Sequence, residues 1–119
     1  MADNPRNLVK RTFEFARSIR RFINRLPWSV SNHEDVRQLA RSSGSVAANY
    51  LEAQEGLSRK DFFYRIKVCR KESRESGLWL ALIETGSDPI MENERKDLMR
   101  EADELKRIFQ SISGKDDTE

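Results

Sequence analysis

Residues 58–86 read SRKDFFYRIKVCRKESRESGLWLALIETG, and this stretch decides the fold class. Ser58 stands three positions before Asp61, which resembles a capping box at the start of a helix. The apolar and small residues that follow recur at steps of three and four, which places them on one helical face. Gly86 suits the left-handed residue after a helix end, so we predict a helix over 59–85. Its expected core face comprises Phe62, Ile66, Cys69, Ser73, Ser76, Leu80 and Ile83.

Three other segments show helical periodicity, and proline or glycine stands near most of their ends. We predict helices over about 5–26, 32–55 and 90–113, followed by a frayed tail over 114–119. Short loops between long helices favour antiparallel neighbours. The sequence therefore predicts one domain over 1–119, an all-α, antiparallel, up-down-up-down four-helix bundle.

The second predicted helix has two features of its own. Ser31 or Asn32 is expected to cap its free backbone N–H groups. Its middle is rich in serine, glycine and alanine, small residues that allow a neighbouring helix to approach closely. A glycine within a helix costs about 1 kcal/mol relative to alanine, so Gly44 is expected to have a packing reason.

The composition excludes several classes of protein. Charged residues make up 35% of the 119 residues, against roughly 25% in an average soluble domain, and the continuous apolar runs of a buried parallel sheet are not found. With no run of about 18 uncharged apolar residues and no secretory signal, we expect a cytoplasmic protein without a membrane span. His33 is the only histidine and Cys69 the only cysteine, so an internal disulfide and a metal site are not expected.

No arrangement of residues points to catalysis. Cys69 falls on the core face, where a thiol packs as a small hydrophobe. Glu72 and Glu75 are the remaining candidates, as a general acid and base, but no histidine, metal or evident pocket accompanies them. An ion pair with Arg41 or with another subunit is the interpretation we favour. The sequence therefore predicts no enzyme, no cofactor and no small-molecule substrate.

The predicted third helix carries a second apolar stripe. At about 100° per residue, this stripe lies on the side opposite Phe62 and Leu80. A helix of a small bundle ordinarily needs one apolar stripe, so a second indicates unusually deep burial or a partner. We favour a partner, and therefore a homo-oligomer. The expected interface residues are Tyr64, Val68, Leu78, Trp79 and Leu82.

Charge is distributed unevenly along the chain. Residues 1–31 carry seven basic and two acidic side chains and residues 58–86 carry seven and four, whereas residues 32–57 and 87–119 are net acidic. If the first and third helices are neighbours, in the bundle or across an interface, their basic rows form a surface for RNA or DNA phosphates. The alternative is a protein-interaction scaffold whose charges only confer solubility. The candidate phosphate contacts are Arg17, Arg21, Lys67, Lys71 and Arg74.

Two blocks of the sequence resemble a known protein family. The first, residues 45–53, reads SVAANYLEA and lies in the predicted second helix. The second runs from Ser58 to Leu80 and includes KESRE at residues 71–75. Over residues 6–112, the chain resembles the small bacterial four-helix-bundle proteins associated with intervening sequences of large-subunit (23S) ribosomal RNA genes.

The resemblance implies a left-handed bundle that assembles as a ring-like homopentamer. It implies no catalytic activity, because the family has none established. A related accessory protein of diversity-generating retroelements binds a reverse transcriptase and nucleic acid, which makes RNA or DNA the expected kind of partner. The family typically has alanine where Cys69 or Ser73 stands, and residues 53–55 depart from its common Glu-Gly ending, but neither difference affects the predicted fold.

Overall fold

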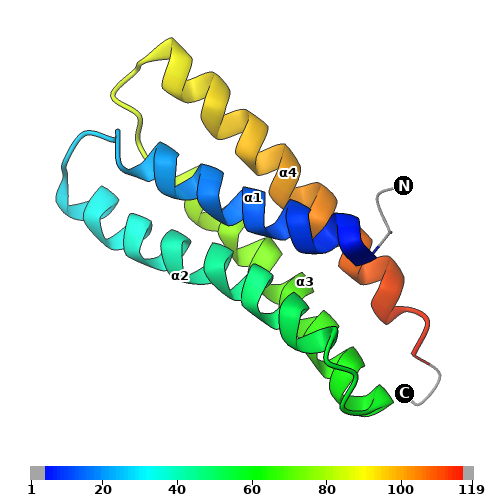
Figure 1. Ribbon diagram of the computed structural model, residues 1–119. Helices are drawn as coiled ribbons and strands as arrows, with labels where there is room; N and C mark the ends of the chain where they lie inside the picture. The colour runs from blue at the N-terminus through cyan, green and yellow to red at the C-terminus, as the bar shows by residue number, and fades with distance from the viewer. Residues whose placement is uncertain (1–4, 117–119) are drawn as a thin grey trace.

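The computed structural model describes the backbone of residues 5–116 and the side chains of residues 7–116. This part of the chain forms four α-helices and contains no strand (Figure 1), so the prediction of an all-α fold with four helices is confirmed. The helices begin and end within three residues of the predicted positions. They are α1 (Pro5–Ile23), α2 (Val30–Ala53), α3 (Arg59–Leu82) and α4 (Pro89–Ser113).

The start of α2 differs from the prediction because Ser29 is its N-cap. Ser29 has an extended backbone (φ −158°, ψ 162°), and its hydroxyl accepts a hydrogen bond from the Asn32 N–H. The prediction of Ser31 or Asn32 as the cap was therefore wrong. Asn32 is buried, and its amide donates to the carbonyls of Pro27 and Glu84 (3.2 and 2.7 Å) and accepts from the Glu84 N–H (3.0 Å). This side chain joins the loop before α2 to the loop after α3.

The two ends of α3 follow local chemistry. The Ser58 hydroxyl accepts a hydrogen bond from the Asp61 N–H (2.9 Å), which confirms the predicted N-cap. The helix ends at Leu82 rather than at residue 85, because Ile83 is already extended (ψ 141°). Arg95 of α4 donates hydrogen bonds to two carbonyls of the last turn (3.2 and 3.4 Å), which are groups that a helix end otherwise leaves unsatisfied.

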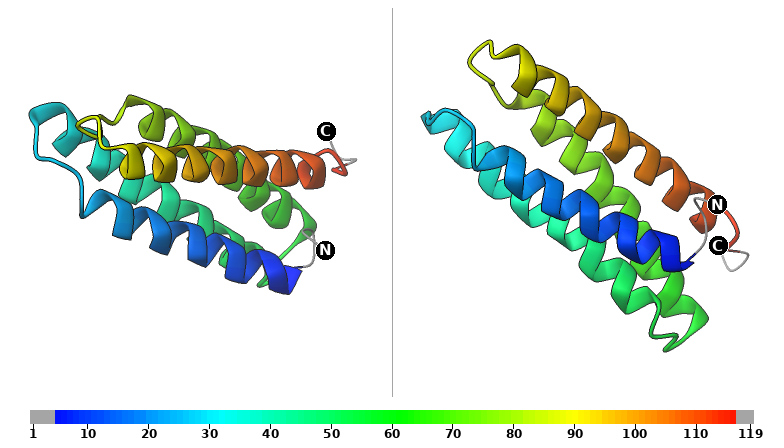
Figure 2. Two further views of the ribbon diagram at one scale, coloured as in Figure 1. Left: turned by 90° about the horizontal axis from the view of Figure 1, so that it is seen from above. Right: turned by 45° about the horizontal axis from the view of Figure 1, so that its top comes forward.

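Each helix packs against two others. α1 and α3 both pack against α2 and α4, whereas α1 and α3 are not adjacent to each other within residues 5–116. The loop between α1 and α2 and the loop between α3 and α4 lie at one end of the molecule, and the loop between α2 and α3 lies at the other end (Figures 1 and 2). The described chain measures 46 × 27 × 21 Å along its principal axes, so most of its surface consists of long helix faces.

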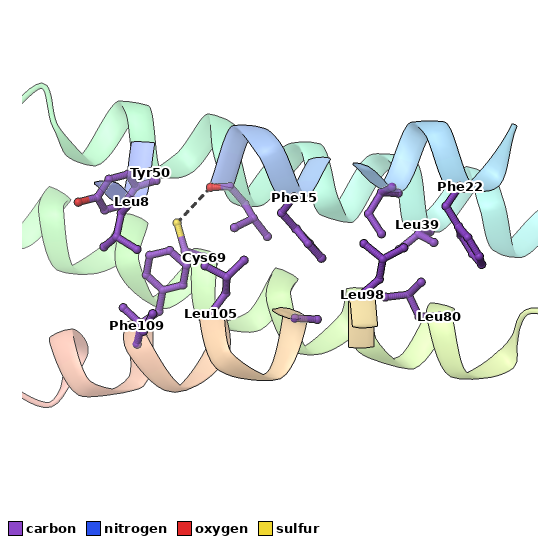
Figure 3. Close-up of a cluster of buried hydrophobic side chains, with 14 of the residues drawn as sticks. Leu8, Phe15, Phe22, Leu39, Tyr50, Cys69, Leu80, Leu98, Leu105 and Phe109 are labelled. Carbon is purple, nitrogen blue, oxygen red and sulfur yellow. Dashed lines mark hydrogen bonds between the residues drawn. The ribbon is translucent and has the colours of Figure 1, made fainter. Parts of the chain in front are cut away.

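The core extends along the length of the bundle (Figure 3). Six of the seven residues predicted for the core face of α3 are buried, and the exception is Phe62. Phe63 is buried in its place, and the two rings pack edge to face with centroids 5.1 Å apart. Small side chains bring α2 and α3 together, since the buried hydroxyls of Ser42 and Ser76 are hydrogen-bonded at 2.8 Å. The largest fully buried side chains include Leu8, Ile19, Phe22, Leu39, Ile66, Leu80, Leu105 and Phe109.

Gly44 lies beside the end of the Arg20 side chain, and close packing of another helix against this glycine stays a prediction. A Cβ atom at this position would lie 3.1 Å from the guanidinium of Arg20. Arg20 crosses from α1 and donates a hydrogen bond to the carbonyl of Ala40 in α2 (3.2 Å). The glycine therefore leaves room for a polar contact between α1 and α2.

Candidate nucleic-acid interface

An open groove with a volume of about 700 Å³ lies between α3 and α4, and we call it the α3/α4 groove. Five cationic side chains line this groove, four of them from α3 and one from α4. Steps of three and four residues bring the α3 cations to one side of that helix. Tyr64, Val68 and Gln110 complete the lining. The five cations are Lys67, Arg70, Lys71, Arg74 and Lys106.

Three of the groove cations have partners within the chain. The Lys67 ammonium lies 3.3 Å from the carboxylate of Asp116, whose side chain is only 5% exposed. Arg70 donates a hydrogen bond to the side-chain oxygen of Gln110 (3.1 Å), which leaves its charge uncompensated. Lys106 lies 3.1 Å from the carboxylate of Asp103. This hydrogen bond, together with one from Arg107, holds the pKa of Asp103 below its ordinary value, so the carboxylate is ionised at neutral pH.

Lys71 and Arg74 have no such partner. Both side chains are exposed, and neither pairs with a carboxylate in the part of the chain that the structure describes. They stand three residues apart, so they project from the same side of α3 into the same groove. A concave surface lined by cations of one sign concentrates anions, and guanidinium and ammonium groups are the side chains that bind phosphates.

The structure brings together only some of the predicted phosphate contacts. Lys67, Lys71 and Arg74 line the α3/α4 groove. Arg17 and Arg21 are exposed on α1, which is not adjacent to α3 within the described chain. A single chain therefore does not merge the two basic rows, and the predicted joint surface would require a contact between subunits.

Two cations of the groove were not predicted from the sequence. Arg70 precedes Lys71 by one residue, so its position beside α4 depends on which side of α3 faces that helix. Lys106 belongs to the acidic segment 87–119, whose net charge conceals it. An antiparallel alignment of α3 and α4 is the signal that could have found both, because it pairs the second half of one helix with the first half of the other.

The second apolar stripe of α3 is divided in the structure. Leu78 and Leu82 are about half exposed (51% and 52%), as a partner surface predicts. Tyr64 is also exposed (59%), but it lines the α3/α4 groove together with Val68. Trp79 is partly buried against the core, with no hydrogen-bond partner for its indole N–H among the described residues. The stripe as a subunit interface stays a prediction.

The carboxylates considered for catalysis form an ion pair. Glu72 is buried, and its two carboxylate oxygens lie 3.3 and 3.4 Å from the guanidinium nitrogens of Arg41 in α2. Glu75 lies 3.5 Å from the same guanidinium. The structure therefore supports the structural interpretation of these residues, in which Arg41 bridges two carboxylates on α3 and links α2 to α3.

Cys69 packs in the core, as predicted. Its thiol is buried and donates a weak hydrogen bond to the Val46 carbonyl (3.5 Å, Figure 3). Burial raises the pKa of this thiol to about 12, so it stays protonated and weakly nucleophilic at neutral pH. Among the residues described, no three His, Cys, Asp or Glu side chains form a group that could hold a metal ion. None of the four helices combines the length and apolar character that a membrane span needs.

The groove and the bundle can now be compared with known proteins. The sequence pattern of the 23S rRNA-intervening sequence protein family matches residues 6–111. The chain belongs to this family. A crystal structure from Bacteroides thetaiotaomicron VPI-5482, of a protein with unknown function from the S23 ribosomal protein family, is similar to it with a TM-score of 0.75. The two sequences are 26% identical, and the match covers 96% of this chain and 99% of the other. No curated protein matches the sequence.

Membership of the 23S rRNA-intervening sequence protein family confirms the resemblance seen in residues 45–53 and 58–80. The family's description refers to intervening sequences of 23S rRNA, and it assigns no reaction. The structural relative is itself described as a protein with unknown function. The molecular role must therefore be argued from the α3/α4 groove.

Proposed function

We propose that this protein is a non-enzymatic, homo-oligomeric, cytoplasmic bundle that binds nucleic acid through the α3/α4 groove. The observation that carries the proposal is the convergence of five cations from two helices on one open groove. Cations that face a common phosphate backbone release its counterions on binding, which drives association without reading the base sequence.

Lys71 and Arg74 are the primary phosphate contacts in this proposal. They are exposed and pair with no carboxylate of the described chain, so binding a phosphate breaks no existing ion pair. The planar guanidinium of Arg74 suits two parallel hydrogen bonds to one phosphate. Lys67 and Lys106 add to the positive electrostatic potential of the groove. Each is paired with a carboxylate, so binding a phosphate replaces one anionic partner with another. Arg17 and Arg21 contribute only if another subunit brings α1 beside the groove.

The oligomer is proposed on separate grounds. Leu78 and Leu82 expose about half of their surface on adjacent turns of α3, next to the groove rather than within it. We infer from the resemblance a left-handed, antiparallel up-down-up-down bundle that forms a homopentamer. The first and third loops lie at one end of the bundle and the second loop lies at the other end, which supports helices that alternate in direction. A sedimentation mass near the 13.9 kDa of one chain would contradict the oligomer.

A protein-interaction scaffold is the second candidate function. The observation in its favour is a group of exposed apolar side chains near the end that carries the first and third loops: Trp28 (77%), Val30 (76%) and Ile90 (74%). These residues lie away from the cations of the α3/α4 groove. Under this alternative, the charged groove would confer solubility only, and nucleic acid would bind weakly or not at all.

Filter binding of RNA and DNA at two salt concentrations tests the proposed function. The Lys71→Glu/Arg74→Glu variant should bind more than tenfold more weakly than the wild type. The loss of two phosphate contacts should also make the negative slope of log K against log salt concentration shallower by about 1.4 for a single strand. The matched control is Lys10→Glu/Lys96→Glu, which reverses two exposed charges outside the groove. An equal loss in the control, or no binding by the wild type, would contradict the proposal.

A further inference from the structure

Tyr64 is an aromatic side chain at the edge of the cationic groove. It is 59% exposed and lines the α3/α4 groove, one turn before Lys67 and two turns before Lys71. Val68 follows one turn later on the same side, and these two residues form an apolar surface beside the cations. An exposed tyrosine next to phosphate-binding groups is the arrangement on which unpaired bases stack.

The Tyr64 ring has a fixed support on one side. The guanidinium carbon of Arg65 lies 5.7 Å from the ring centroid, a cation–π distance. Arg65 is itself held by a hydrogen bond to the side-chain oxygen of Asn49 in α2 (3.1 Å) and by the carboxylate of Asp61 (3.6 Å). The amide of Asn49 in turn donates to Ser45 (3.0 Å). One face of the ring is therefore supported by polar contacts that connect Arg65 to Asn49 and Ser45 of α2.

The arrangement of cations in the groove favours single-stranded nucleic acid over a duplex. Cations from both helices line the groove and can flank one backbone. The distance from Lys67 to Arg74 is about 10 Å along the helix, which matches about three phosphate spacings of one strand.

We propose that the α3/α4 groove binds single-stranded nucleic acid, with one unpaired base stacked on Tyr64. This inference rests on the proposed function and adds the class of nucleic acid to it. The phosphates bind along Lys67, Lys71 and Arg74, and the base next to the phosphate at Lys67 lies over the phenol ring. Paired bases in a duplex are stacked on one another and cannot reach the ring, so a duplex makes only the phosphate contacts.

The test measures binding of the full-length protein to labelled oligo(A) RNA, oligo(dA) and a duplex that contains the same oligo(dA) strand. Both single strands should bind more tightly than the duplex. Tyr64→Ala should weaken single-strand binding about tenfold, with the salt slope unchanged because stacking releases no counterion. Tyr64→Phe should restore binding, since stacking needs the ring and not the hydroxyl. Leu51→Ala, which removes a half-exposed side chain of α2 outside the groove, is the matched control.

Four results would overturn the inference. Tighter binding of the duplex, or unchanged single-strand binding by Tyr64→Ala, would overturn it while the charge-reversal experiment could still support the proposed function. A change in sedimentation mass of Tyr64→Ala together with its binding would instead place Tyr64 between subunits. If no strand binds to the wild type, the proposed function fails and the inference fails with it. Thermal unfolding of each variant checks that it is folded, so that a loss of binding can be distinguished from a loss of structure.

Discussion

The first and third helices are both rich in cations, but they use them differently. The segment with α1 is the more basic in sequence. In the structure, however, Arg11 binds Glu101 and Glu104 of α4 (2.8 and 2.7 Å), and Arg25 binds Glu94. In α3, Lys71 and Arg74 remain exposed beside a groove. The difference teaches that the groove is marked by cations of two helices that converge on one concave surface, and not by the net charge of a segment.

The helix between these two regions explains the difference. α4 packs against both α1 and α3, and its carboxylates are not evenly placed. Glu94, Glu101 and Glu104 pair with α1 and the residues that follow it, whereas Lys106 and Gln110 face the groove beside α3. Carboxylates of α4 therefore bind Arg11 of α1 and Arg25 after it, whereas beside the groove α4 contributes the cation Lys106.

Replacement of Arg11 should give the largest effect and sharpen this comparison. Arg11 is mostly shielded from solvent and joins α1 to α4 through two carboxylates, and the hydrogen bond to Glu101 raises the pKa of its guanidinium. Arg11→Ala should lower the free energy of unfolding by about 1–2 kcal/mol, because two carboxylates lose their partner. Urea unfolding measures this change, and the nucleic-acid affinity of the folded variant should stay the same.

The matched control for Arg11 is Arg17→Ala on the same helix. Arg17 is exposed and pairs with no carboxylate of the described chain, so its loss should change stability by less than about 0.5 kcal/mol. Equal destabilisation by both variants would contradict the comparison, because it would mean that paired and unpaired arginines of α1 contribute equally to stability.

Replacement of Asp116 should have a smaller effect, and on affinity rather than stability. The Asp116 carboxylate neutralises Lys67 at the edge of the α3/α4 groove. Asp116→Asn should raise nucleic-acid affinity about two- to fivefold at low salt, because one carboxylate that competes with a phosphate for Lys67 is removed. Asp97→Asn makes the same change of charge on an exposed α4 carboxylate that pairs with Arg100. An equal gain in that control would show a general charge effect with no contribution from the groove.

Replacement of Asp103 by Asn should have the smallest effect on nucleic-acid affinity. It should raise the affinity by about twofold or less, because this carboxylate is half exposed and its pairing with Lys106 is weak.

Asp103 also makes the stability of the protein depend on pH. The hydrogen bond from Lys106 keeps the pKa of Asp103 below its ordinary value of 3.8. The ionised form is thus favoured by folding, and its contribution to stability is present above pH 3.8 and lost as the pH falls below it. Melting temperatures of Asp103→Asn should therefore decline less steeply below this pH than those of the wild type.

The fold was largely accessible from the sequence because its signals are local. The spacing of three and four along residues 58–83 predicted the core face of α3, and Ser58 predicted its N-cap. The errors arose where tertiary contacts decide between local alternatives. Ser29, Ser31 and Asn32 all stand near the start of α2. The Ser29 hydroxyl is the one that accepts from the Asn32 N–H, while the Asn32 side chain binds the distant Glu84 carbonyl.

The groove was only partly predictable for the same reason. Lys67, Lys71 and Arg74 share one side of α3 by periodicity alone, so the sequence revealed them. Lys106 joins them from a distant helix, and Arg17 and Arg21 are kept apart from them because α1 and α3 are not adjacent within residues 5–116. Helical periodicity gives the face on which a residue lies, but not which helix stands beside that face.

The most direct test of the central claim compares two double charge reversals in one nucleic-acid titration at several salt concentrations. One variant is Lys71→Glu/Arg74→Glu in the α3/α4 groove, and the other is Arg17→Glu/Arg21→Glu on α1. Both change the charge of the chain equally, so a nonspecific effect would be the same in each. We predict that the groove variant loses more than tenfold in affinity and part of its salt dependence, while the α1 variant stays within about threefold of the wild type. Equal losses, or a larger loss in the α1 variant, would contradict the assignment of binding to the groove.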